Sequence, residues 1–158
     1  MAATDPQSVG WGGMAWSQWH DFDQARDDRL IPSTPGLYRF RVQHEEGLLY
    51  IGESGARWAR LDDLARARRR HTADYYLKGL GDPGHSSAPY FILCEDAGCR
   101  IEVSWALDER LDKTDRRAAE ARLIRLHREA TGEDPPVQHG GKGVAAYLRR
   151  RANAVSPP

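Results

Sequence analysis

The stretch GLYRFRVQHEEGLLYIG, residues 36–52, decides the fold of this chain. Its two halves, residues 37–42 and 48–51, are rich in β-branched, aromatic and leucine side chains, which favour strands. The polar residues between them end in glycine, a pattern typical of a hairpin. A hairpin would bring Tyr38 and Tyr50 close together. From their spacing alone, two such tyrosines most often serve as cross-strand packing.

The tripeptides Gly-Leu-Tyr at 36–38 and Tyr-Ile-Gly at 50–52 resemble the signature of the GIY-YIG nuclease superfamily. Residues 31–35 contain prolines, as is common before the first strand in that family. The resemblance spans residues 31–141 and implies a small α+β domain. Such a domain has an antiparallel or mixed sheet of three or four strands flanked by helices, the class that the order of elements also indicates.

Three later residues match the family in order: Arg60 on the helix after the hairpin, Glu120 on a later helix, and Gln138 after a proline-containing turn. The resemblance implies a DNA endonuclease in which Tyr38 is the general base and Arg60 stabilises charge on the phosphate. It further implies that Glu120 holds one Mg²⁺ or Mn²⁺ and that Tyr50 orients water or Tyr38. Cleavage would leave a 5′-phosphate and a 3′-hydroxyl.

The residue types agree with these roles. Arg60 borders an apolar stripe on the helix expected over 55–71, and a guanidinium matches phosphate geometry with two hydrogen bonds. Glu120 shares an apolar helix face with residues 123–124, where a carboxylate is costly to bury unless it is paired or bound to metal. Magnesium often takes only one or two protein carboxylates. His127 lies on the same face and is expected to be packed.

Gln138 stands where the family normally has asparagine, so the amide lies one methylene further from the backbone. A site that depends on close positioning can lose much of its rate through such a change. We therefore keep an alternative function, a catalytically weak or inactive domain that binds DNA or another protein. An α+β domain unrelated to nucleic acid is the third reading.

The net charge of zero does not decide about nucleic acid, because the charges are segregated along the chain. Residues 60–71 include five arginines, and no acidic residue follows Gly140. Such basic runs can bind a phosphate backbone, although they can also be ordinary solvated helix faces. The residues expected to contact DNA are Arg57, Arg68, Arg69, Arg70, His71, Lys142, Arg149 and Arg150.

The sequence predicts three regions. Residues 1–30 form an extension that packs on the domain, residues 31–141 form the nuclease-like domain, and residues 142–158 form a basic helix and tail. The other expected elements are helices over 15–28, 114–130 and 144–154, strands over 90–94 and 100–107, and a loop over 79–89.

The chain has no apolar stretch of 18 residues, so no membrane span is expected. Residues 1–10 lack the pattern of a secretory signal, which favours a cytoplasmic protein. Cys94 and Cys99 flank a turn and could be cross-strand neighbours, with reduced thiols as the expected state. The Ala- and Arg-rich composition is typical of a GC-rich bacterial genome. The sequence leaves a homodimer open.

Overall fold

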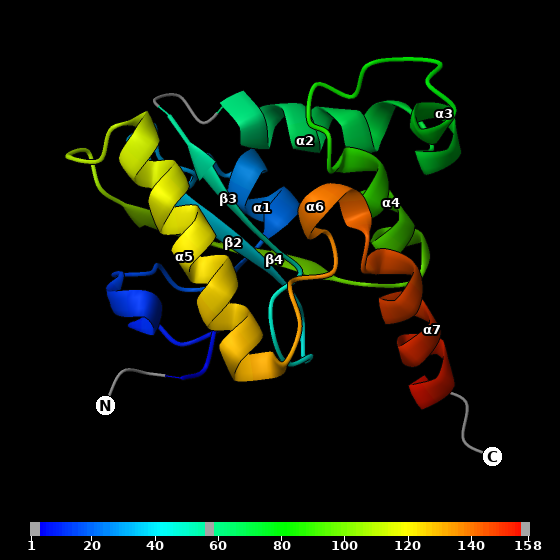
Figure 1. Ribbon diagram of the computed structural model, residues 1–158. Coiled ribbons are helices and arrows are strands. Elements are labelled where there is room, and N and C mark those ends of the chain that lie inside the picture. The colour runs from blue at the N-terminus through cyan, green and yellow to red at the C-terminus, as the bar shows by residue number, and fades with distance from the viewer. Residues whose placement is uncertain (1–3, 56–58, 156–158) are drawn as a thin grey trace.

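The centre of the computed structural model, which describes residues 4–55 and 59–155, is a four-stranded antiparallel sheet (Figure 1). The strand order is β1-β4-β2-β3, so β3 lies at one edge. The α+β prediction is confirmed, in its antiparallel form. The strands are β1 (His20–Asp21), β2 (Gly36–Val42), β3 (Tyr50–Ser54) and β4 (Ile101–Leu107).

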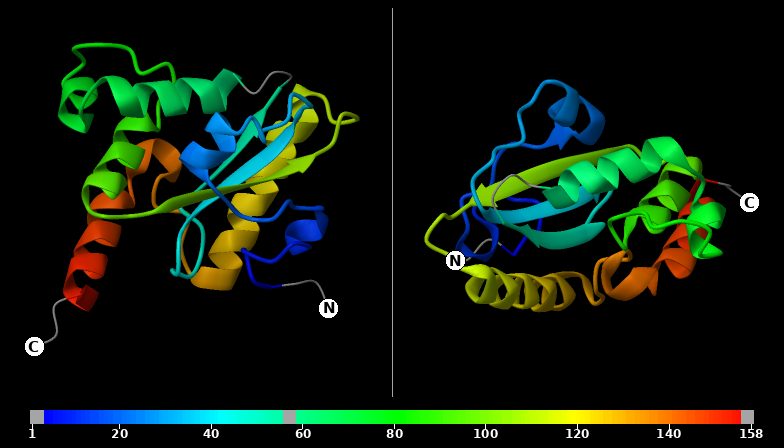
Figure 2. Two further views of the ribbon diagram at one scale, coloured as in Figure 1. Left: turned by 180° about the vertical axis from the view of Figure 1, so that it is seen from behind. Right: turned by 90° about the horizontal axis from the view of Figure 1, so that it is seen from above.

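Helices cover both faces of this sheet. Figure 2 shows α5 on one side and α1 and α2 on the other in the view from above. The α-helices are α1 (Phe22–Asp27), α2 (Ala59–Arg70), α3 (Ala73–Leu77), α4 (Ala88–Asp96), α5 (Lys113–Thr131), α6 (Gln138–Gly141) and α7 (Val144–Val155). One 3-10 helix, η1 (Trp11–Gly13), precedes them.

The predicted hairpin is confirmed as β2 and β3, with Tyr38 opposite Gly52 in the register. Alternate residues of β2 enter two separate cores. Tyr38 and Phe40 pack under α2 and α4, whereas Leu37 packs with Ile51 under α5. This hairpin therefore connects both layers of the molecule.

The predicted strand over 90–94 is wrong, because these residues lie in α4. Most residues of this helix are buried or half-buried, so its apolar residues show little helical periodicity, and a short apolar run of this kind is equally consistent with a strand. Cys94 and Cys99 are consequently not cross-strand neighbours. Both are buried free thiols at the C-terminal end of α4.

The N-terminal helix predicted over 15–28 is wrong for its first half, and only α1 is helical. The preceding segment instead lies across the sheet, and the guanidinium of the buried Arg39 sits between two of its rings, 4.3 Å from Trp16 and 4.6 Å from Trp19. Cation–π contacts of this kind explain why tryptophans gather in this segment. The prediction that they pack rather than stack on bases is supported by the burial of Trp11 and Trp16.

The strand over 100–107 is confirmed as β4, and its residues Ile101 and Val103 are buried. Ser104 is buried, and Leu107 is 45% exposed. Both faces of β4 are covered along most of its length, and the apolar alternation cannot reveal such double coverage.

Other helix predictions hold closely. The helices expected over 114–130 and 144–154 are α5 and α7, and α5 ends at Gly132, whose φ of 88° provides the left-handed cap. The helix expected over 55–71 is α2 within the described residues, and α3 is a separate helix capped by Thr72. Across residues 4–55 and 59–155, no helix combines the length and apolar character needed to cross a bilayer.

Candidate active site

The two signature tyrosines lie side by side at the β2–β3 pair, on the face covered by α2. Their ring centroids are 6.2 Å apart with the planes tilted by 37°, and both rings are buried. The ring of Tyr38 lies directly over the α-carbon of Gly52, where a Cβ would overlap it. The glycine of the second tripeptide is thus required by the tyrosine of the first.

Arg60, an exposed residue in the first turn of α2, reaches these tyrosines with its side chain. Burial lowers the pKa of Arg60, but Tyr38, Tyr50 and the Glu53 carboxylate outweigh this effect and raise it. The guanidinium lies close enough to Tyr38 to act on it through both charge and a hydrogen bond. The predicted meeting of arginine and tyrosines is therefore present.

The Tyr38 hydroxyl is in an environment that opposes ionisation. Burial raises its pKa well above the ordinary value, the nearby Tyr50 raises it further, and Arg60 works in the opposite direction. A phenol in such surroundings accepts a proton from water only when positive charge stabilises the phenolate. The cationic partners of Tyr38 therefore decide whether it can act as a base.

Glu120 approaches the same edge strand from α5, on the other face of the sheet. Burial and the neighbouring Glu53 carboxylate raise the pKa of Glu120 to about 7, while Arg60 and the backbone N–H of Glu53 oppose that rise. Glu53 itself accepts a hydrogen bond from Arg116 Nε at 2.9 Å. Within the described residues β3 is an edge strand, so Arg60 from α2 and Glu120 from α5 can act on each other around that edge.

The carboxylates at this edge suit Mg²⁺ better than an ion whose ligands all come from protein side chains. Within the described parts of the chain, no group of three or more His, Cys, Asp or Glu side chains could hold a metal. Magnesium does not need such a group, because it keeps several waters and binds one or two carboxylates plus a substrate phosphate. The half-buried Glu120, whose ionised form is disfavoured, would gain stability from a cation beside it.

Gln138 holds the edge strand. Its Oε1 accepts a hydrogen bond from the Ile51 N–H at 3.1 Å, and its Nε2 donates one to the Ile51 carbonyl at 2.9 Å. The backbone groups of an edge strand that face outward need such partners when they are buried. With its amide engaged in this way, Gln138 holds the strand that carries Tyr50 and Gly52.

Replacing Gln138 with alanine should lower the free energy of unfolding by about 2 kcal/mol, because two buried backbone groups of Ile51 lose their partners. Urea unfolding monitored by circular dichroism measures the change. Gln138→Glu is the matched test, since a carboxylate still accepts from the N–H but cannot donate to the carbonyl. A stability of Gln138→Ala equal to that of the unaltered chain would contradict this role.

Three further side chains at the site carried no assigned role in the sequence. Glu53 directly follows the second tripeptide, so its proximity could have been noticed. His85 and Ser87 lie in the predicted breaker-rich loop, and nothing in their spacing places them beside the tyrosines. The Nε2 of His85 lies 3.4 Å from the Tyr38 hydroxyl oxygen, and the Ser87 side chain hydrogen-bonds Tyr50.

The described residues among those predicted to contact DNA lie on different parts of the molecule. Arg68 packs over Phe22 and forms ion pairs with Glu95 and Asp23, with a side chain only 7% exposed. Arg68 therefore has a structural role and is not available to contact DNA. Arg69 pairs with Asp23 and Asp27 but stays half-exposed.

Five of the other basic residues are exposed: Arg70, His71, Lys142, Arg149 and Arg150. Among them, His71 stacks on Tyr75 with 3.9 Å between ring centroids. Arg57 lies outside the described residues. Arg70 ends α2 and Arg149 lies in α7, two helices that extend in different directions from the sheet (Figure 1), whereas His71 and Lys142 lie just outside these helices. Arg60, in contrast, acts on both tyrosines.

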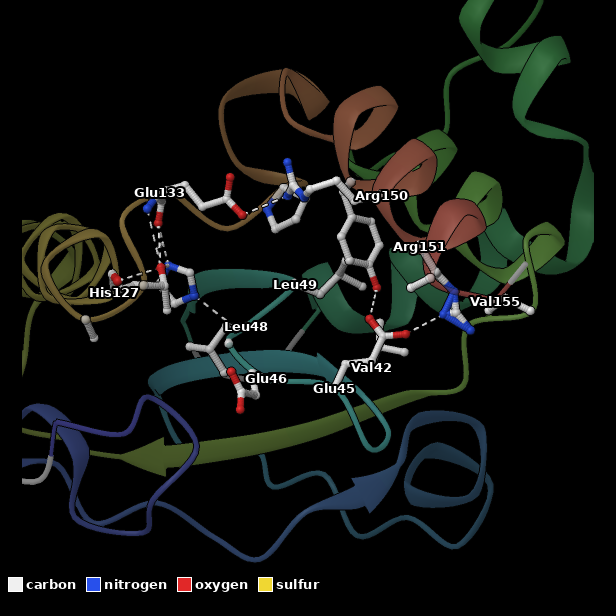
Figure 3. A pocket seen from close by; sticks show the side chains of 16 residues that line it. Val42, Glu45, Glu46, Leu48, Leu49, His127, Glu133, Arg150, Arg151 and Val155 are labelled. Carbon is white, nitrogen blue, oxygen red and sulfur yellow. Dashed lines mark hydrogen bonds and ion pairs between the residues drawn. The ribbon is translucent and has the colours of Figure 1, made fainter. Parts of the chain in front are cut away.

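A separate cavity of about 660 Å³ lies between the hairpin turn, the end of α5 and α7 (Figure 3). Arg150 enters it and pairs with Glu133 at 2.8 Å, while Arg151 and Tyr147 both bond Glu45. His127 lies at its wall, buried as predicted, and accepts a hydrogen bond from the Leu48 N–H. None of the candidate catalytic residues lines this cavity.

No family model, no curated protein and no solved structure matches this chain.

Proposed function

We propose that this protein is a divalent-metal-dependent endonuclease that hydrolyses phosphodiester bonds in DNA. One observation carries the proposal: residues 38, 50, 60 and 120, separated by up to 82 positions in the chain, gather at one edge of the sheet. Their chemistry is complementary, with two phenols, one guanidinium and one carboxylate. Packing alone would not select this combination, because an ionised carboxylate at a half-buried position opposes folding.

In this proposal, Tyr38 takes a proton from the attacking water and Tyr50 helps to orient that water. Arg60 stabilises the charge that develops on the phosphate oxygens, where a guanidinium can donate two parallel hydrogen bonds. A Mg²⁺ or Mn²⁺ ion held by Glu120 would supply Lewis-acid stabilisation of the leaving 3′-oxygen. The products would carry a 5′-phosphate and a 3′-hydroxyl.

Arg60 has a second task in this scheme, because it bears on the acidity of Tyr38. An unperturbed phenol is almost fully protonated at neutral pH and is therefore a poor general base. Burial makes the phenolate of Tyr38 still harder to form. Arg60 opposes that effect, because its positive charge lowers the pKa of Tyr38. The tyrosine and the arginine therefore act as one unit.

Purified protein incubated with plasmid, linear and single-stranded DNA should cut at least one substrate with Mg²⁺ or Mn²⁺ and none with EDTA. Tyr38→Phe should lower that cutting at least about 100-fold, because general-base catalysis contributes about this much. Tyr75→Phe is the matched control, since it removes a hydroxyl from a tyrosine on α3 that lies outside the site. Gel electrophoresis measures cutting by the unaltered protein and by both variants.

The alternative function makes a different prediction in the same experiment. A domain that only binds DNA would show salt-sensitive binding with no cutting under either metal. That outcome would reject the nuclease in favour of a binding or protein-interaction module. Absence of both binding and cutting would leave a domain unrelated to nucleic acid.

A further inference from the structure

His85 is buried beside Tyr38, although it comes from the loop between α3 and α4. Only 1% of its surface is exposed. Its Nε2 lies 3.4 Å from the Tyr38 hydroxyl oxygen, and its Nδ1 faces the Ser87 backbone N–H at 3.2 Å. Both ring nitrogens are therefore engaged, one by the backbone of its own loop and one by the candidate base.

These two contacts assign the tautomer of the ring. A backbone N–H can only donate, so Nδ1 must accept and carries no proton. A neutral imidazole then bears its proton on Nε2, which donates to the Tyr38 oxygen. Burial and the nearby Arg60 lower the pKa of His85 to about 4, so the ring is neutral at neutral pH.

The direction of this hydrogen bond matters for the tyrosine. A donor pointing at the phenol oxygen favours the phenolate over the neutral phenol, and bonds to charged groups are the stronger ones. The other titratable groups that act on Tyr38 are Tyr50 from β3, Arg60 from α2 and Glu120 from α5. Of these, only Arg60 also favours the phenolate, so His85 adds a second donor to the same oxygen.

The loop that delivers His85 also serves the second tyrosine. The Ser87 side chain hydrogen-bonds Tyr50, and its hydrogen bond lowers the pKa of Tyr50, against the larger effect of burial. Ser87 is itself buried and stands directly before α4. The first turn of α4 thus anchors a segment whose polar groups meet both phenols.

We propose that His85 is a positioning residue that donates a hydrogen bond from Nε2 to Tyr38, fixing its hydroxyl and stabilising its deprotonated form. This inference rests on the proposed nuclease function for its catalytic consequence. Its structural core, a neutral ring with the proton on Nε2, does not depend on activity.

Kinetics test the catalytic consequence. His85→Phe should lower kcat for DNA cleavage about 10- to 100-fold, with KM unchanged, because the lost bond acts on the charged phenolate. His85→Gln, whose side-chain amide can still donate, should recover part of that loss. The matched control is His20→Phe at the opposite edge of the sheet, where a phenyl ring can keep the stacking on Trp105. Equal rates in the phenylalanine and glutamine variants would overturn the inference while leaving the nuclease proposal standing.

Nitrogen NMR of the ring in the unaltered protein tests the tautomer without any reaction. The expected spectrum shows His85 neutral, with Nε2 protonated and Nδ1 not, unchanged on acidification to about pH 5.5 because the pKa is about 4. A proton on Nδ1, or titration near the ordinary histidine value, would overturn the inference. If the protein cuts no DNA, the nuclease proposal fails, and this spectrum still decides whether His85 donates to Tyr38.

Discussion

Arg60→Ala should lower the rate of DNA cleavage about 1,000-fold, the largest single loss expected at this site, because the arginine has two roles. It stabilises charge on the phosphate, and it is the cation that favours the Tyr38 phenolate. The stability of the fold should change little, because Arg60 is an exposed residue in the first turn of α2. Single-turnover cleavage and thermal unfolding measure the two effects separately.

Arg70→Ala is the matched control for this change. It removes another exposed arginine from α2, at the end of the helix far from the tyrosines. Arg60→Lys should recover only part of the activity, because an ammonium keeps the charge but loses the two-pronged contact with phosphate. Equal losses in Arg60→Ala and Arg70→Ala would show that general attraction of DNA explains the effect and would remove Arg60 from the mechanism.

Glu120→Gln should abolish metal-dependent cleavage and at the same time make the protein more stable. Burial and Glu53 raise the pKa of Glu120 to about 7, so its neutral form is the one that suits the folded state. The stabilisation of that neutral form is fully present below the unfolded pKa of about 4.5 and is lost as the pH rises through about 7. Glutamine, which cannot ionise, keeps it at every pH.

The expected gain in the free energy of unfolding is about 2 kcal/mol at about pH 8, falling to nearly zero at about pH 4. Urea unfolding at the two pH values measures it, and Glu129→Gln, an exposed position on the same helix, is the control. Added Mg²⁺ should raise the melting temperature of the unaltered protein but not of Glu120→Gln. A variant that is less stable than the parent above neutral pH would contradict this account.

Much of the site could be predicted from the sequence, because its residues lie in elements with strong local signals. Strand propensity and the glycine-ending turn placed Tyr38 and Tyr50 on a hairpin, which the register confirms. The apolar face of α5 marked Glu120 as an unusual carboxylate, and its raised pKa agrees. The helix predicted over 114–130 closely matches α5, which ends at Thr131.

Other parts failed for identifiable reasons. Residues 90–94 of α4 predict a strand, because a mostly buried helix offers little polar patterning to reveal its period. The two hydrogen bonds from the Gln138 amide to the Ile51 backbone could not be predicted from the sequence, because they join segments 87 positions apart. Arg68 looked like a phosphate ligand, whereas acidic partners from α1 and α4 occupy it.

The sequence by itself determined the hairpin, the helix that carries Glu120 and the order in which the candidate residues occur, because these depend on patterns within single segments. The tertiary structure alone decided that His85 lies against Tyr38 and that Glu53 lies beside Glu120. It also decided that the tyrosine ring fills the space above Gly52. Such contacts join segments whose separation in the chain has no period, so only the packing of helices around the edge strand brings them together.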